Sequence, residues 1–144
     1  MKVAVIMGGT SVERDVSLKT GQAVMSACIE LGYKAKSVDF NGDYHSTLSE
    51  LEHSDIVFNA LHGTIGEDGT IQSWLDEKNI AYTGSGGDAS RLCMNKNESK
   101  KIVRKNNYLT PDWTVIQNNN VKNARKNFKL FDFPLIVKPN SQGS

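Results

Sequence analysis

Residues 1–17 read MKVAVIMGGTSVERDVS, and this stretch decides the fold. Its apolar, β-rich run at residues 3–7 stops at two glycines, which is typical of a buried strand in a parallel sheet. The run is too short for the apolar region of a signal peptide. A helix is expected next, ending at Gly32 and packing through an apolar stripe of Val16, Ala23, Val24, Ala27, Cys28 and Leu31.

The alternation of strands and helices continues to about residue 84. Further strands are expected at residues 34–40, 55–61 and 80–83. Between residues 67 and 79, a helix is indicated by the apolar face of Ile71, Trp74 and Leu75. Strands that alternate with helices predict a doubly wound α/β layer with a parallel sheet and right-handed crossovers. We therefore expect an N-terminal α/β domain over residues 1–84.

The charge balance changes near the end of this domain. Residues 1–90 carry six Lys/Arg and thirteen Asp/Glu, a net charge of −7, whereas residues 91–144 carry eleven and three, a net charge of +8. The change indicates a domain boundary near residues 85–90. The basic surface is either ordinarily solvated or meets an anion such as a nucleotide phosphate. Nucleic acid is not favoured as a partner, because no aromatic-rich basic motif accompanies the lysines.

The second segment, residues 85–144, has its own pattern of expected elements. It predicts helices at residues 88–94, 95–106 and 121–129 and strands at residues 111–116 and 134–138. Its last residues belong to a glycine-containing loop. This segment is expected to be a second, incomplete domain.

The remaining composition excludes some classes of protein. No apolar run approaches the roughly 20 residues that span a bilayer, so we expect a cytoplasmic protein without a membrane partner. The two cysteines, Cys28 and Cys93, lie in separate segments and show no metal-ligand spacing. We expect both to be buried, reduced thiols.

Two loops carry residues suited to binding a ligand. The loop after the first strand lies where open α/β sheets bind ligands, at the carboxyl end of a strand and facing a helix N-terminus. Within it Glu13 offers a carboxylate for a substrate ammonium, although Ser11 and Glu13 are also ordinary residues for a helix start. His62 follows the third strand at the same edge of the sheet. It is either a packed, hydrogen-bonded histidine or part of a shared pocket.

Two further signals concern nucleotides. Residues 84–89, Gly-Ser-Gly-Gly-Asp-Ala, mimic a dinucleotide fingerprint, but they follow the fourth strand and no acidic residue stands about 20 residues later. A nicotinamide cofactor is therefore rejected. Lys96 and Lys138 are either solvated charges or phosphate ligands, and Lys138 precedes a glycine-containing loop.

Five ordered blocks of residues resemble the D-alanine–D-alanine ligases of the ATP-grasp superfamily. They cover essentially the whole chain: Gly8-Gly9-Thr10-Ser11-x-Glu13-Arg14-x-Val16-Ser17-Leu18; Leu61-His62-Gly63 with Gly66-Glu67-Asp68-Gly69-Thr70-Ile71-Gln72; Tyr82-Thr83-Gly84-Ser85-Gly86; Met94-x-Lys96 with Ser99-Lys100; and Val137-Lys138-Pro139 with Gly143-Ser144. The resemblance implies a Rossmann-like domain that precedes the ATP-grasp domain, followed by the first part of that domain.

The resemblance also implies an activity. Such enzymes use ATP to convert the carboxylate of one D-alanine into an acyl phosphate, which the amine of a second D-alanine attacks; the product serves peptidoglycan synthesis. On this chain, it implies that Glu13 binds the ammonium of the first D-alanine, in a subsite with Val16 and Ser17. His62 would lie near the carboxylate of that D-alanine.

The nucleotide roles are carried over in the same way. Lys96 and Lys138 would bind phosphates of ATP. Ser144 would belong to the loop that closes over the reacting substrates, and it would form a hydrogen bond to the network around Glu13. Magnesium, the adenine pocket and their ligands are expected beyond Ser144, because the family's chains are roughly twice as long. The fragment alone is thus expected to be inactive, and the full-length protein to be a homodimer.

Two alternatives remain open from the sequence. One is a ligase of the same family whose second substrate is D-lactate or D-serine. The other is a non-catalytic module that binds a small amino acid.

Overall fold

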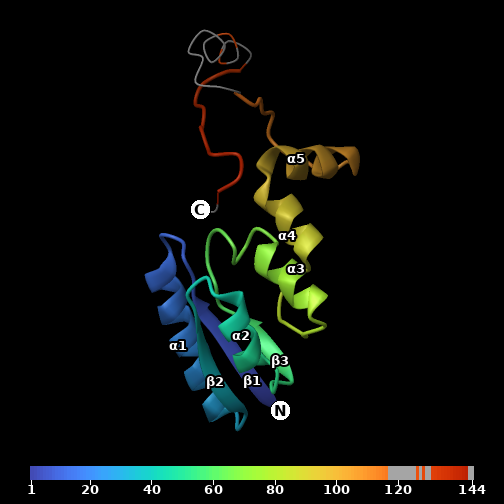
Figure 1. Ribbon diagram of the computed structural model, residues 1–144. Coiled ribbons are helices and arrows are strands. Elements are labelled where there is room, and N and C mark those ends of the chain that lie inside the picture. Colours follow the sequence, from blue (N-terminus) through green and yellow to red (C-terminus); the bar gives the residue numbers. More distant parts are fainter. Residues whose placement is uncertain (117–125, 127, 129–130, 143–144) are drawn as a thin grey trace.

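The computed structural model describes residues 1–116, 126, 128 and 131–142, and its ribbon is shown in Figure 1. Three parallel strands form a sheet in the order β2-β1-β3. The central strand β1 (Lys2–Gly8) pairs over its whole length with β2 (Lys34–Phe40) and on its other side with β3 (Ile56–Asn59). The predicted central parallel strand is therefore confirmed.

Helices cover both faces of the sheet. Successive side chains of β1 point to opposite faces, so they pack in two different cores. Val3, Val5 and Met7 pack on the face covered by α1 (Arg14–Glu30). Ala4 and Ile6 pack on the opposite face with residues of α2 (Tyr44–Leu51) and α3 (Thr70–Glu77). Helices on two faces of a parallel sheet confirm the α/β class.

Helix α1 packs through only part of the predicted stripe: Val24 and Cys28 lie against the core. Its fully buried residues are Ser17 and Gly21, whereas Val16 and Leu31 are 53% and 72% exposed. The prediction that Val16 and Leu31 face the core is therefore wrong. The physical reason is close approach: a Cβ at Gly21 would lie 2.6 Å from Met7 Cβ, so small residues form the contact and the larger ones flank it.

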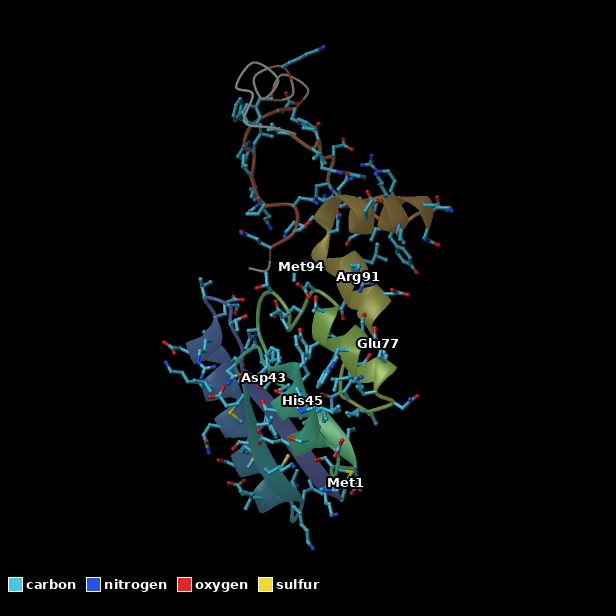
Figure 2. The ribbon with its side chains drawn as sticks, viewed as in Figure 1. Met1, Asp43, His45, Glu77, Arg91 and Met94 are labelled. Carbon is cyan, nitrogen blue, oxygen red and sulfur yellow. The ribbon has the colours of Figure 1, made fainter. Side chains whose placement is uncertain are left out.

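The remaining differences within residues 1–84 are at short elements. Helix α2 was not predicted. Asp43, which is labelled in Figure 2, immediately precedes it and caps it by accepting hydrogen bonds from the backbone N–H groups of His45 and Ser46. Strand β3 is shorter than the predicted 55–61. The predicted strand at 80–83 is reduced to one parallel bridge between Val57 and Tyr82.

After the sheet, α4 (Gly87–Met94) and α5 (Lys96–Lys105) follow α3 away from the sheet (Figure 1). Both helices were predicted. The strands predicted at residues 111–116 and 134–138 are wrong, since the described residues there form none, and Ile136 and Val137 are 81% and 74% exposed. A strand needs a paired neighbour, and apolar alternation alone does not supply one. Of the helix predicted at 121–129, the structure describes only residues 126 and 128, both helical. The domain boundary at 84/85 stays a prediction.

The cysteines differ from each other. Cys28 is half-buried against the α1 face of the sheet, but Cys93 is exposed, so the prediction of two buried thiols is wrong for Cys93. Cys93 lies on α4, which packs against other helices and not against the sheet. In the part of the chain that the structure describes, no helix is both long and apolar enough to cross a membrane.

Candidate functional site

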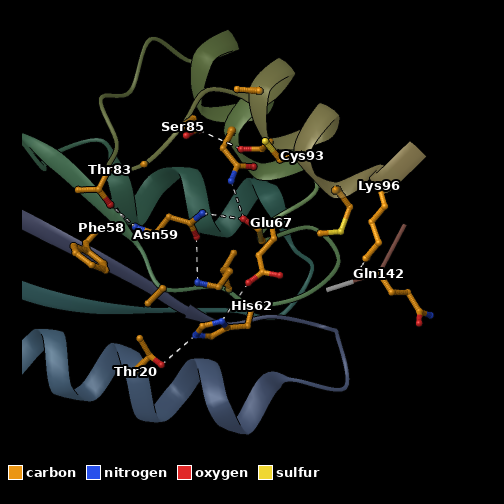
Figure 3. A pocket seen from close by; sticks show the side chains of 18 of the residues that line it. Thr20, Phe58, Asn59, His62, Glu67, Thr83, Ser85, Cys93, Lys96 and Gln142 are labelled. Atoms are coloured by element: carbon orange, nitrogen blue, oxygen red, sulfur yellow. Dashed lines mark hydrogen bonds and ion pairs between the residues drawn. The ribbon is translucent and has the colours of Figure 1, made fainter. Parts of the chain in front are cut away.

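A cavity of about 1100 Å³ lies at the carboxyl end of β3 (Figure 3). One wall comes from the end of β3 and the loop after it, and another from α4, the start of α5 and the segment at residues 138–142. Polar and charged side chains lining it include Thr20, Asn59, His62, Glu67, Gln72, Cys93, Lys96, Lys138 and Gln142. This is the edge of the sheet at which open α/β folds bind ligands.

A buried serine joins the two loops that end β1 and β3. Ser17 Oγ accepts a hydrogen bond from Gly8 N at 2.9 Å and donates one to Ala60 O at 2.7 Å. Its side chain has no exposed surface. Ser17 therefore fixes the start of α1 against both strand ends, with no free group of its own for a ligand.

The loop at residues 9–13 lies against the loop that follows β3. Ser11 Oγ donates to the carbonyl of His62 and accepts from Glu13 N. Gly63 has a φ of 69°, and a Cβ there would collide with the carboxylate of Glu13. These contacts place Glu13 beside Gly63, next to the cavity but not among the residues that line it.

An ion pair braces the other side of the same loop. The guanidinium of Arg14 makes two hydrogen bonds to the carboxylate of Asp39, at 2.9 and 2.7 Å. This hydrogen bonding raises the pKa of Arg14 above its ordinary value. Gly8 makes room for the pair, because a Cβ at that position would collide with Asp39 and Arg14. The glycine that ends β1 is thus needed for packing within the chain.

His62 is held from two sides. Its Nε2 lies 3.1 Å from Thr20 Oγ1 on α1, and its Nδ1 lies 3.5 Å from Glu67 Oε1 (Figure 3). The His62 side chain is about one-third exposed. All three residues line the cavity, so they form a polar line along its wall.

Side-chain amides fix the loop that carries His62 and Glu67. Asn59 Nδ2 and Gln72 Nε2 both donate to the carbonyl of Gly66, at 3.0 and 2.7 Å. A Cβ at Gly66 would lie 2.6 Å from the carbonyl carbon of Leu61, so only glycine fits. The loop is therefore closely packed against the end of β3.

Asp68 supports the strained part of the same loop. Ile65 has a φ of 73°, an unusual value for a β-branched residue, and its N–H donates to Asp68 Oδ2. Partial burial raises the pKa of Asp68, but hydrogen bonds from Thr70 and from the Ile65 and Thr70 backbone together lower it below its ordinary value. The ionised carboxylate thus keeps the turn in place.

The basic wall is organised around the start of α5. The backbone carbonyl of Asn140 accepts a hydrogen bond from Lys96 N, and its side-chain oxygen accepts one from Asn97 N. The side-chain amide of Asn140 donates to the side-chain oxygen of Asn95. Lys96 Nζ donates to the carbonyl of Gln142 at 2.5 Å. Residues 138–142 are thereby tied to α5, which places Lys96 and Lys138 on the same cavity.

The residues predicted for the site are therefore only partly brought together. His62, Lys96 and Lys138 share the cavity, and Glu13 is adjacent to it. Val16 is 53% exposed and Ser17 is buried, and neither lines the cavity. Ser144 lies outside the described residues.

Two residues at the site, Thr20 and Glu67, were not predicted as functional. Thr20 stands 42 positions from His62 in the sequence, so no local spacing connects them. Glu67 stands in one of the blocks that carry the family resemblance, but the sequence alone assigns it no role in the site. Its distance of five residues from His62, within a glycine-rich loop, is the one signal that could have paired them.

Comparison with known proteins gives consistent matches. The family model described as "D-ala D-ala ligase N-terminus" matches residues 33–85. A D-alanine--D-alanine ligase from Aquifex aeolicus is 44% identical over 145 residues, which cover 100% of this chain and 48% of the relative. The chain thus spans about half the length of the curated relatives it matches.

Solved structures agree with the sequence matches. A D-alanine--D-alanine ligase from Bacillus anthracis superposes with a TM-score of 0.84 at 38% identity, covering 100% of this chain and 47% of that one. The same enzyme has also been solved in complex with ATP, with a TM-score of 0.80. The VanG D-Ala:D-Ser ligase from Enterococcus faecalis has a TM-score of 0.77 at 26% identity, covering 100% of this chain and 53% of that one.

Proposed function

Because this chain matches D-alanine–D-alanine ligases along its whole length and spans about half of theirs, we propose that it belongs to that family and supplies the first D-alanine site and one wall of the ATP site of such a ligase. The observation that carries the proposal is the cavity that His62 shares with Lys96 and Lys138. It joins a site for a small amino acid to two cations within one space.

Glu13 is proposed to bind the ammonium of the first D-alanine. It stands at the N-terminal end of α1, against the Gly63 backbone and beside the cavity. A hydrogen bond between charged groups in such a place is worth about 1.5–3 kcal/mol. Ser17 acts indirectly, because its buried hydroxyl holds the loops that carry Glu13 and His62.

Lys96 and Lys138 are proposed to bind phosphate oxygens of ATP. Phosphoryl transfer depends mainly on positioning and on cations that neutralise the transferred group. The cavity brings together two ammonium groups from distant parts of the chain. The solved ATP complex of the Bacillus anthracis relative supports ATP as the nucleotide.

Magnesium is expected to accompany ATP, and the described residues form no cluster of three metal-binding side chains. Within residues 1–116, 126, 128 and 131–142, no group of three His, Cys, Asp or Glu side chains could hold a metal ion. We therefore assign no magnesium ligand to this part of the chain. When bound with ATP, the ion would neutralise charge on the phosphates.

The proposed reaction forms D-alanyl-D-alanine for peptidoglycan through an acyl phosphate. The Aquifex aeolicus and Bacillus anthracis relatives, 44% and 38% identical to this chain, are both named D-alanine--D-alanine ligases, which supports D-alanine as the second substrate. We further propose that the 144 residues alone do not catalyse it, because they match less than half the length of the relatives. D-alanine-dependent phosphate release from ATP by these residues would contradict this.

The test of the first-substrate site is an NMR titration of the ¹⁵N-labelled chain. D-alanine should shift the amide signals of residues 9–13 and 62–67, and L-alanine should shift them much less. E13Q should weaken D-alanine binding about tenfold or more, since the amide is a neutral acceptor. E30Q, at the far end of α1, is the matched control. Equal shifts with both alanines, or equal affinities of E13Q and E30Q, would contradict the proposal.

The division of roles is tested in a full-length enzyme. E13Q should raise the KM for D-alanine far more than the KM for ATP, and K138A should do the reverse. The same kinetic defect in both variants would show that the two residues do not serve different substrates.

A further inference from the structure

The contacts of His62 differ in chemical kind. Glu67 presents a carboxylate to Nδ1, whereas Thr20 presents a hydroxyl to Nε2. An ionised carboxylate can only accept a hydrogen bond, but a hydroxyl can donate or accept. A neutral imidazole has one nitrogen that donates and one that accepts.

From this asymmetry we propose that Glu67 and Thr20 are positioning residues, which hold His62 in the tautomer with its proton on Nδ1. Nδ1–H then points to Glu67, and the hydroxyl of Thr20 donates to Nε2. The opposite tautomer would place the lone pair of Nδ1 against the Glu67 carboxylate, which is repulsive. The separation of 3.5 Å between Nδ1 and Oε1 is long for a hydrogen bond, so the preference is electrostatic: the carboxylate attracts Nδ1–H and repels an Nδ1 lone pair.

The loop holds Glu67 where this role requires it. Glu67 N donates to Gly63 O at 2.9 Å, which closes a turn directly after His62. The carbonyl of Gly66 receives the two amide hydrogen bonds from Asn59 and Gln72. Glu67 is thus fixed by its own backbone and by the preceding residue, and its side chain reaches back to the ring.

The tautomer determines which ligand group can meet His62. With the proton on Nδ1, Nε2 is an acceptor, so a group that replaces the Thr20 hydroxyl must bring a hydrogen, as an ammonium or amide does. A carboxylate at Nε2 requires the ring to gain a proton first. This consequence for D-alanine rests on the proposed function; the tautomer itself does not.

The experiment is ¹⁵N NMR of the imidazole rings in the folded chain. Spectra are taken at alkaline pH, where the ring shifts no longer change with pH, and the other two histidines, His45 and His53, serve as internal references. His62 should show a protonated Nδ1 and an unprotonated Nε2. E67Q should shift the tautomer ratio by about tenfold toward Nε2–H. T20V should keep the proton on Nδ1.

Matched controls separate this from a loss of structure. E77Q, at the end of α3, should leave the His62 tautomer unchanged, and amide spectra report whether each variant is folded. The proposal is overturned by Nε2–H in the unaltered chain, by an unchanged ratio in folded E67Q, or by reversal in T20V. If E67Q does not fold, E67D, which keeps an acceptor-only carboxylate, should preserve the Nδ1 proton, and reversal there overturns it.

The two proposals fail in different ways. If D-alanine shifts no signals while His62 keeps its proton on Nδ1, the proposed function is contradicted and the positioning role stands. If D-alanine binds while His62 carries its proton on Nε2, the positioning role is contradicted and the proposed function stands.

Discussion

Replacement of Ser17 by alanine tests how the candidate site is assembled. The Ser17 hydroxyl bonds the Gly8 N–H and the Ala60 carbonyl, both at the ends of strands, and is fully buried. Alanine removes both bonds and leaves a buried donor and a buried acceptor. Each such group costs about 1–3 kcal/mol, and alanine's better helix propensity returns only about 0.5 kcal/mol. We expect S17A to lower the free energy of unfolding by about 2–5 kcal/mol.

Ser26 offers a matched control on the same helix. Its exposed hydroxyl donates to Gln22 O, a carbonyl within the helix, so S26A removes no bond that joins α1 to the sheet. S26A should change stability by less than about 0.5 kcal/mol, in either direction.

The stability of both variants is measured by urea unfolding. Circular dichroism and tryptophan fluorescence monitor the transition, and Trp74 packs against the core. The midpoint should fall in S17A with an unchanged slope, since the surface exposed on unfolding is the same. Equal midpoints for S17A and S26A would show that the Ser17 bonds contribute nothing, and the assembly of the two loops would need another explanation.

Three further predictions follow from single positions. G66A should destabilise the chain by about 2 kcal/mol or more in the same assay, because its Cβ would lie 2.6 Å from the Leu61 carbonyl carbon; wild-type stability would contradict this. Hydrogen bonds from Ser46 and His45 lower the pKa of Asp43, so its contribution to stability is present above about pH 4 and is lost as the pH falls through the lowered pKa. A pKa of Asp43 at or above the ordinary value of Asp, measured by ¹³C NMR titration of its carboxyl group, would contradict this prediction. A thiol reagent should modify exposed Cys93 faster than half-buried Cys28, and equal rates would count against it.

The parts of the fold that followed from the sequence are those with a strong local pattern. The apolar run of β1 indicated a strand buried on both faces, and the structure divides its side chains between two cores. Helices α3, α4 and α5 were also predicted. In each case the pattern within one segment was enough to determine the element.

The predictions and the structure differ where tertiary contacts determine which residues are buried or which segments form strands. The buried face of α1 is centred on Ser17 and Gly21, two residues that a search for apolar periodicity ignores. Residues 135–137 form a continuous apolar run of the kind found in a buried strand, yet they have no strand beside them among the described residues. Local periodicity states what a segment can form, and its neighbours determine whether it forms.

The site shows the same limit. His62 and Glu13 could be placed at the same edge of the sheet from the sequence, because the carboxyl ends of adjacent parallel strands lie together. The contacts of Thr20 and Glu67 with His62 depend on how α1 and the loop after β3 approach each other. That approach is set by Ser17 and by the Gly66 turn, whose functional meaning appears only in three dimensions.

The two walls of the cavity are held by different forces. The wall with His62 rests on two apolar cores and on buried hydrogen bonds, whereas α5, which begins at Lys96, has no buried residue. Many of its contacts are polar and exposed, such as the ion pair of Arg104 with Asp112, and exposed pairs contribute little stability. An anion bound between Lys96 and Lys138 would favour the arrangement that brings them together, by mass action. Nucleotide binding should therefore stabilise the basic wall more than the sheet wall.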